Sequence, residues 1–289
     1  MYSNLVLSGG AFKAISLLGS IKYLENIDIL KNFKQFIGTS AGGVIVFFII
    51  IGYTSDDIKE ILINEMECLT NLNIDNITDF LEDFGIEDSS KNKIILKKYL
   101  FNKTGLNEIT FIEFTKKFGI NLIITGSNLT TRELNYFNID NTPNMNIIDA
   151  LLITTCLPII NKPIKYNDFL YLDGALYNNF ALDYFKNKSN DTLGICVSGY
   201  YSNKNENVVN YFYNIIFSMM DKLTYDNISK NKYNICSIYF DKSKSNDIDF
   251  SLENMKINID NKWITKYYNY GYDEFKKYYI NLQKNKILE

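Results

Sequence analysis

The chain of 289 residues contains no histidine. A Ser-His-Asp triad is therefore impossible, which excludes the ordinary α/β-hydrolase and trypsin-like mechanisms. Arg132 is the only arginine, so bidentate arginine clamps on phosphate or carboxylate are nearly excluded. The net charge is −3, and phosphate neutralisation needs a basic face. We therefore expect no nucleic-acid partner.

Cysteines and long apolar runs are also scarce. The four cysteines stand about 40 or more residues apart without a C-x-x-C pair, at Cys68, Cys156, Cys196 and Cys236. This spacing favours reduced, buried thiols over a metal site, and we predict neither a metal nor a cofactor. The longest apolar run, VIVFFIII at 44–51, is shorter than the ~20 residues that span a bilayer. The N-terminus lacks a signal-peptide pattern, so we predict an intracellular, cytoplasmic protein.

What the chain does contain is an alternation of strands and helices in its first 53 residues. Strands are predicted at 2–7 and 35–38, and helices at about 11–25 and 41–51. This βαβ pattern is typical of an α/β fold with a mostly parallel sheet.

Residues 54–118 have a different pattern, because helical spacing dominates and no strand-like run interrupts it. Helices are predicted from 54 onward and at 78–84, 89–101 and 110–118. We interpret this segment as a helical insert, which could act as a lid.

Strand character returns after the insert. Strands are predicted at 120–129, 132–139, 169–175, 192–199 and 234–240, with a helix at 146–158 and a C-terminal helix at about 261–285. No linker rich in Gly, Ser or Pro divides the chain. We therefore predict a single domain, 1–289, whose core comprises about 1–53 and 120–240.

A candidate nucleophile lies in IGTSAGG, residues 37–43. Ser40 is flanked by Gly38 and Gly42, where a predicted strand becomes a helix. Small flanking residues let neighbouring chains approach such a strained turn closely. The helix that follows places free N–H groups and a positive dipole end near the serine oxygen. The alternative is a serine that merely caps its helix.

The base for Ser40 must be a lysine or a carboxylate. Asp173 is the strongest candidate, because it ends the apolar strand FLYL and precedes Gly174. This position is the carboxyl edge of an open sheet, where chemistry usually takes place. A partly desolvated aspartate can accept a hydroxyl proton. Asp168 and Asp149 are weaker candidates.

The segment SGGAFKA, residues 8–14, follows the first strand. Consecutive amides at a helix N-terminus can stabilise an oxyanion. Our candidates are the amides of Gly9, Gly10 and Ala11, with Lys13 adding positive charge. A phosphate cradle is the rival interpretation, but the spacing fits neither nucleotide-binding pattern.

Three motifs in this order, LVLSGGAFKA, IGTSAGG and YLDGALYNN, resemble the patatin-like phospholipase family. DALLITTCLP resembles the helix and proline that precede the family's aspartate motif. The resemblance implies a three-layer α/β/α sandwich and calcium-independent hydrolysis of glycerolipid acyl esters. It also implies a dyad of Ser40 and Asp173, an oxyanion hole at Gly9 and Gly10, and supporting roles for the glycines at 38, 42 and 174.

The chain departs from the family pattern at two glycines, which are replaced by Ala11 and Ala14. These replacements leave a second hypothesis open, a catalytically silent protein that binds lipid or a partner protein. A third hypothesis is a thioesterase or neutral-lipid lipase on the same dyad. Some relatives need a cellular activator, so the resemblance also allows a protein activator.

A lipid ester substrate implies contact with a membrane surface. The C-terminal helix carries an aromatic series at Trp263, Tyr268, Tyr272, Phe275 and Tyr279. Such a stripe usually packs into a core, and we favour that interpretation. The alternative is an aromatic face at the lipid interface, beside Lys276 and Lys277.

Overall fold

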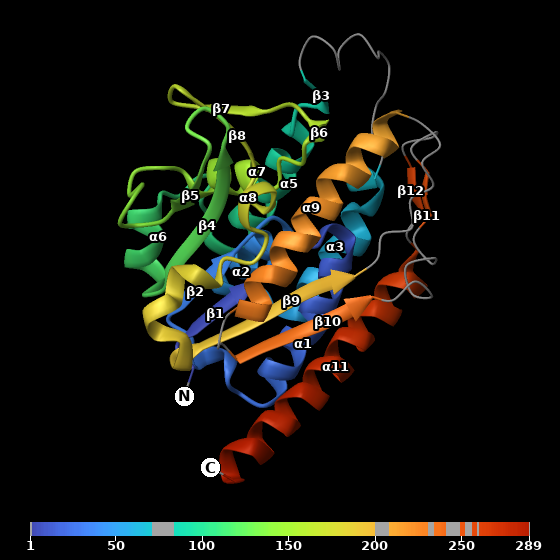
Figure 1. Ribbon diagram of the computed structural model, residues 1–289. Helices are drawn as coiled ribbons and strands as arrows, with labels where there is room; N and C mark the ends of the chain where they lie inside the picture. The colour runs from blue at the N-terminus through green and yellow to red at the C-terminus, as the bar shows by residue number, and fades with distance from the viewer. Residues whose placement is uncertain are drawn as a thin grey trace.

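The computed structural model describes residues 2–70, 84–199, 208–230, 234–240, 249–251, 256–258 and 260–288. It is a mixed α/β structure built on one large sheet (Figure 1). Within these residues, no helix combines the length and the apolar character needed to cross a bilayer.

Five neighbouring strands of the large sheet run parallel. The sheet order is β10-β9-β1-β2-β4-β8-β7, with β5 also paired to β4, and β5, β7 and β8 supply the antiparallel pairs. The strands are β1 Asn4–Leu7, β2 Gln35–Gly38, β3 Gly85–Glu87, β4 Asn121–Asn128, β5 Glu133–Phe137, β6 Ile159–Asn161, β7 Ile164–Tyr166, β8 Phe169–Asp173, β9 Thr192–Gly199, β10 Asn234–Phe240, β11 Asp249–Ser251 and β12 Lys256–Asn258.

Helices connect these strands and cover the sheet. They are α1 Ile15–Asn26, α2 Ala41–Ile50, α3 Ser55–Thr70, α5 Ser90–Thr104, α6 Phe111–Phe118, α7 Ile147–Thr154, α8 Ala175–Asn178, α9 Val208–Lys230 and α11 Asn261–Leu288, with 3-10 segments η1 Ala11–Ala14, η2 Leu30–Asn32 and η3 Leu182–Asp191.

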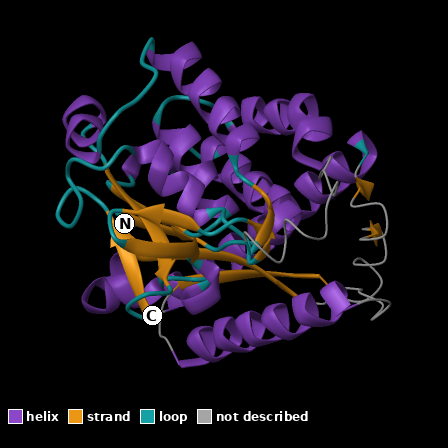
Figure 2. Cartoon of the chain, turned by 90° about the horizontal axis from the view of Figure 1, so that it is seen from above, coloured by secondary structure: helices purple, strands orange, loops and turns teal. Residues whose placement is uncertain are grey.

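Helices lie on both sides of the sheet, as the view from above shows (Figure 2). On one face, α1, α2, α7 and α11 share one apolar core with the strands. On the other face, Val6, Ile37 and Ile123 of the strands pack against η3, with Ile228 near the end of α9 joining them. This arrangement confirms the predicted three layers with a mostly parallel sheet.

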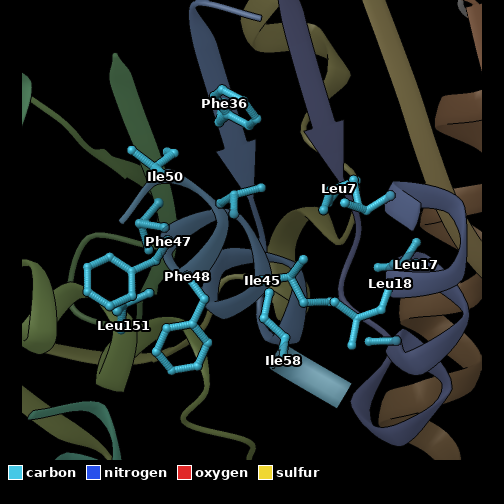
Figure 3. Close-up of a cluster of buried hydrophobic side chains, with 14 of the residues drawn as sticks. Leu7, Leu17, Leu18, Phe36, Ile45, Phe47, Phe48, Ile50, Ile58 and Leu151 are labelled. Carbon is cyan, nitrogen blue, oxygen red and sulfur yellow. The ribbon is translucent and has the colours of Figure 1, made fainter. Parts of the chain in front are cut away.

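The centre of the larger core is α2, whose sequence AGGVIVFFII is apolar on every side. Figure 3 shows Ile45 beside Ile58 of α3 and the leucines of α1, with Phe47 toward Leu151 of α7. Because most of α2 is buried, its N-terminus is held firmly at the end of β2.

Most predicted elements are confirmed, including the strands at 35–38, 192–199 and 234–240 and the C-terminal helix. Cys156, Cys196 and Cys236 are free and buried, as expected, and the side chain of Cys68 lies outside the described part.

The expectation that no strand interrupts the insert is wrong. β3 lies within it and pairs in parallel with β6, at Gly85↔Ile159. Three residues are too short to leave a periodic signal, and their partner is more than 70 positions away. The helix predicted at 78–84 falls almost entirely outside the described residues. Helix α9 was not predicted at all.

Candidate active site

Ser40 lies in a strained turn between β2 and α2. Its backbone has φ 53° and ψ −130°, a conformation that L-residues rarely adopt. The amide of Ser40 donates a buried hydrogen bond of 2.9 Å to the hydroxyl of Thr154, at the end of α7. The side chain is 6% exposed. The turn therefore has the geometry that presents a serine hydroxyl at the edge of a sheet.

Asp173 ends β8 and is completely buried. Its amide donates to the carbonyl of Cys156 at 2.7 Å. Its Oδ1 accepts a hydrogen bond of 2.8 Å from the amide of Ala175. These two bonds fix both the backbone and one carboxylate oxygen.

The protonation of Asp173 is shifted toward neutral pH. Burial raises its pKa to about 7, against the smaller lowering effects of hydrogen bonding from the Ser40 hydroxyl and the Ala175 amide. Among the described residues, Oδ2 of Asp173 has no hydrogen-bond partner. The lowering effect of Ser40 on the pKa of Asp173 indicates that the two side chains are close to each other. The structure brings together the two side chains that the sequence singled out.

The glycine loop after β1 runs directly beside Ser40. A Cβ on Gly9 would lie 2.9 Å from the Cβ of Ser40, so only glycine fits this close approach. The amide of Gly9 donates to the carbonyl of Asn179 at 3.2 Å. Within the described part of the chain, the amides of Gly10 and Ala11 donate to no acceptor. Two of the three predicted amides are therefore available to bind an anion.

Lys13 lies in η1, just after the predicted amides of the glycine loop. Its side chain is 2% exposed and does not line the pocket that contains Ser40. The ammonium lies 3.4 Å from the carbonyl of Gly199 and 5.5 Å from the ring centre of Phe240. Burial lowers its pKa to about 8, and the charge of Asp221 on α9 opposes that shift. Lys13 thus connects the loop to β9 and α9.

The remaining predicted glycines allow the backbone to pack closely around Ser40 and Asp173. A Cβ on Gly38 would collide with the backbone of Gly42 and Gly43, and one on Gly42 with the carbonyl of Ser8. A Cβ on Gly174 would collide with Thr125. The lack of a side chain at all three positions therefore allows the backbone to pack closely around the serine turn and the end of β8.

A cavity of about 280 Å³ opens beside Ser40, and its walls are mostly apolar. Residues of η1 and α2 line one part of the cavity, and residues of α3 and α5 in the insert line another. Its apolar lining includes Ile45, Phe48, Ile61, Leu62, Ile95 and Leu96. A few polar side chains, among them Glu65 and Lys91, also reach it. An apolar cavity that contains a serine hydroxyl suits a flexible apolar ligand.

The aromatic series of the C-terminal helix belongs to the core. Trp263, Tyr268 and Phe275 are buried. Tyr23 of α1 contacts Tyr272 and Tyr279 at ring-centre distances of 5.4 and 5.9 Å. The preferred interpretation of this stripe is confirmed, and its alternative as a lipid-facing surface is wrong.

Neither weaker aspartate candidate lies at the site. Asp168 is exposed in the turn between β7 and β8. Asp149 stands in the first turn of α7, 3.9 Å from the ammonium of Lys93.

Thr154 was not predicted as a site residue, although its hydroxyl supports the turn at Ser40. The motif DALLITTCLP, which contains Thr154, is the sequence signal that could have indicated this supporting role.

The fold and the strained serine turn are typical of an α/β acyl hydrolase. The profile of the patatin-like phospholipase family matches residues 5–186, which include the glycine loop, Ser40 and Asp173. The chain belongs to the patatin-like phospholipase family. Membership supports lipid hydrolase activity.

Two viral proteins are similar in sequence. "Probable lipid hydrolase 463L" of Invertebrate iridescent virus 6 is 34% identical over 219 residues, 73% of this chain and 74% of that protein. "Uncharacterized protein R571" of Acanthamoeba polyphaga mimivirus is 29% identical, over 96% of this chain and 94% of that protein.

Two bacterial structures share the fold. VipD from Legionella pneumophila has a TM-score of 0.62 at 16% identity, with 96% of this chain matched to 66% of VipD. ExoU in its complex with SpcU from Pseudomonas aeruginosa has a TM-score of 0.53 at 12% identity, with 97% of this chain matched to 51% of ExoU. The chain therefore spans half to two thirds of these proteins' length.

Proposed function

We propose that this protein is a calcium-independent serine acyl hydrolase that cleaves fatty-acyl esters of glycerophospholipids through a dyad of Ser40 and Asp173. The observation that carries the proposal is the pairing of a strained, pocket-lining serine with a fully buried carboxylate. The pKa of that carboxyl is about 7, near the operating pH of a general base.

The reaction takes place in two halves. Asp173 accepts the proton of Ser40 as its oxygen attacks the ester carbonyl, and the amides of Gly10 and Ala11 stabilise the oxyanion. Collapse of the tetrahedral intermediate breaks the ester bond, and Asp173 gives the proton to the departing lysolipid alcohol. Asp173 then takes a proton from water, which attacks the acyl-serine. Collapse of the second tetrahedral intermediate breaks the acyl-serine bond, Asp173 gives its proton to the Ser40 oxygen, and the fatty acid is released.

The apolar cavity supports an acyl chain as the ligand. Its lining of Ile, Leu and Phe side chains offers burial but few directed hydrogen bonds, so binding energy comes mainly from apolar contact. We infer that α3 and α5 form part of the wall of the acyl site. Three free, buried thiols among the described residues support an intracellular site of action.

A fluorophosphonate probe tests the nucleophile. We expect covalent labelling of Ser40, identified by peptide mapping, and no labelling of Ser40→Ala. We also expect wild-type protein to release fatty acid from mixed phospholipid vesicles with EDTA present. Activity that survives Ser40→Ala, or that EDTA abolishes, would contradict the mechanism.

The silent-protein hypothesis has one supporting observation, because Ala11 has a positive φ of 46° where glycine would be unstrained. It predicts a folded protein in which Ser40 resists the probe. Parallel assays with acyl-CoA, triacylglycerol and phosphatidylcholine separate the thioesterase and neutral-lipid alternatives, since the preferred substrate has the highest kcat/KM.

A further inference from the structure

Helix α9 exposes an apolar stripe on its outer side. Ile215, Met219 and Leu223 recur every four residues and are 37%, 62% and 49% exposed. Phe217, Met220 and Thr224, on the opposite side of the same helix, are buried. One face of the helix is therefore packed against the protein, and the other presents apolar side chains to solvent. Such a continuous series of large exposed apolar residues is unusual.

Helix α9 starts at the edge of the sheet that carries the site. α9 connects β9 to β10, and these two strands are parallel. It therefore begins at the carboxyl edge of the sheet, the edge at which β2 leads into Ser40, and runs back toward the amino edge (Figure 1). The stripe lies in the middle of this helix, Val208–Lys230, so it extends from the half that starts at this edge into the half that leads away from it.

The inner face of α9 contacts the surroundings of the site. Phe217 and Met220 share a core with Ile160, which lines the cavity, and with Ala175, which hydrogen bonds to Asp173. Asp221 of α9 interacts electrostatically with Lys13 of the glycine loop. The stripe is thus the outer surface of an element that packs behind the candidate active site.

We propose that α9 is the membrane-contacting helix of this protein and that Ile215, Met219 and Leu223 enter the lipid surface. The inference rests on the proposed function, because an enzyme that cleaves lipid esters must reach a membrane surface. It goes beyond the family assignment, since α9 lies outside the matched residues 5–186.

The size and charge of the stripe favour a lipid surface over a protein. A stable protein interface uses about 20–30 residues a side, whereas a lipid surface needs no shape complementarity and accepts a single helix face. Lys222 and Asp226 at the end of the stripe neutralise each other at 2.7 Å. We therefore expect apolar burial, rather than attraction to anionic lipid, to provide the binding.

Vesicle flotation tests the inference, with Ser40→Ala protein so that no lipid is consumed. We expect binding to pure phosphatidylcholine vesicles that persists at about 0.5 M salt, where exposed charges are screened. In that background, Met219→Gln with Leu223→Gln should weaken binding more than about tenfold, because apolar area is lost. Glutamine keeps both the net charge and the helix propensity.

The matched control is Ile94→Gln with Phe101→Gln on α5, two residues that are 68% and 51% exposed. It should bind within about twofold of the parent. Equal binding by both double variants would overturn the inference, as would binding that requires anionic lipid and disappears in salt. A wild-type dimer that Met219→Gln with Leu223→Gln converts to a monomer would assign the stripe to self-association instead.

Hydrolysis of a water-soluble ester by the wild-type protein separates the two proposals. If the wild type binds vesicles through α9 but cleaves no ester, the proposed function fails and the membrane surface stands. If it cleaves the ester but does not bind vesicles, α9 is not the membrane contact.

Discussion

Ser40 lies just past the end of β2 and Asp173 is the last residue of β8 in the same sheet, yet their surroundings differ. Ser40 adopts a strained backbone conformation and lines an apolar cavity. Asp173 has no exposed surface and does not line that cavity. One side chain can be reached by a ligand, while the other is shielded from water and therefore has a raised pKa. A dyad without histidine requires this division, because an exposed aspartate is too weak a base at neutral pH.

The largest expected effect comes from removing the base. Asp173→Asn keeps the shape of the side chain but cannot accept a proton, so kcat/KM should fall about 10³-fold. Asp168→Asn, in an exposed turn, is the matched control and should retain wild-type turnover. Comparable losses in both variants would remove the distinction between the two aspartates.

Asp173→Asn should also be more stable than the wild type at alkaline pH. The folded-state pKa of Asp173 is about 7, above its ordinary value of 3.8. The folded protein therefore binds the Asp173 proton more tightly than the unfolded chain does. The stabilisation that this proton gives the folded state is fully present below pH ~4 and is lost as the pH rises through ~7. At pH ~8 we expect Asp173→Asn to exceed wild type by up to about 4 kcal/mol in unfolding free energy. Denaturant titrations at both pH values measure the difference, which should vanish near pH ~4.

The pH dependence of activity gives the next largest effect. Asp173 must be ionised to accept a proton, so kcat/KM should decrease about tenfold per pH unit below its pKa of about 7. Between pH ~7 and ~5 the loss should be about 50-fold, because half of Asp173 is already protonated at pH ~7. A water-soluble ester assayed across this range gives the profile. A flat profile with an intact fold would exclude Asp173 as the base.

A smaller effect is expected from the support of the serine turn. Thr154→Val removes the acceptor of the Ser40 amide, which costs about 1–3 kcal/mol for a buried unsatisfied donor. We expect a lower Tm and about tenfold slower labelling of Ser40 by the probe. Thr154→Ser keeps the hydroxyl and should restore both values. Failure of serine to restore the labelling rate would indicate a packing role for Thr154.

The smallest effect should come from the glycine loop. Ala11 has φ 46°, which costs an L-residue about 1 kcal/mol and glycine much less. Ala11→Gly should therefore raise the unfolding free energy by up to about 1 kcal/mol and change kcat/KM less than about threefold. A large gain in turnover would instead show that alanine restricts the oxyanion hole.

Local sequence signals identified the elements that hold the site. The strand that ends before Ser40, the buried helix after it and the strand that ends at Asp173 are each short apolar runs with a glycine at or next to the C-terminal end. Periodicity and turn chemistry act within a few residues, so they can be read without a structure. The absence of histidine also limited the base to a carboxylate or a lysine before any distance was known.

The long helices show what local signals leave open. α11 carries its aromatic residues at helical spacing, and the tertiary structure buries them against α1. α9 has a comparable apolar content but leaves Met219 and Leu223 exposed. A helix's own sequence gives the period of its apolar residues, whereas burial depends on which distant element packs against it.

The sequence by itself therefore determined the family motifs, the alternation of strands and helices, and the candidacy of Ser40 and Asp173. The tertiary structure decided that the amide of Gly9 bonds to Asn179, that Thr154 holds the amide of Ser40, and that β3 pairs with β6. Each of these contacts joins residues more than 70 positions apart. Neither hydrophobic periodicity nor turn residues identify such distant partners, because these contacts form only when the whole chain folds around the sheet.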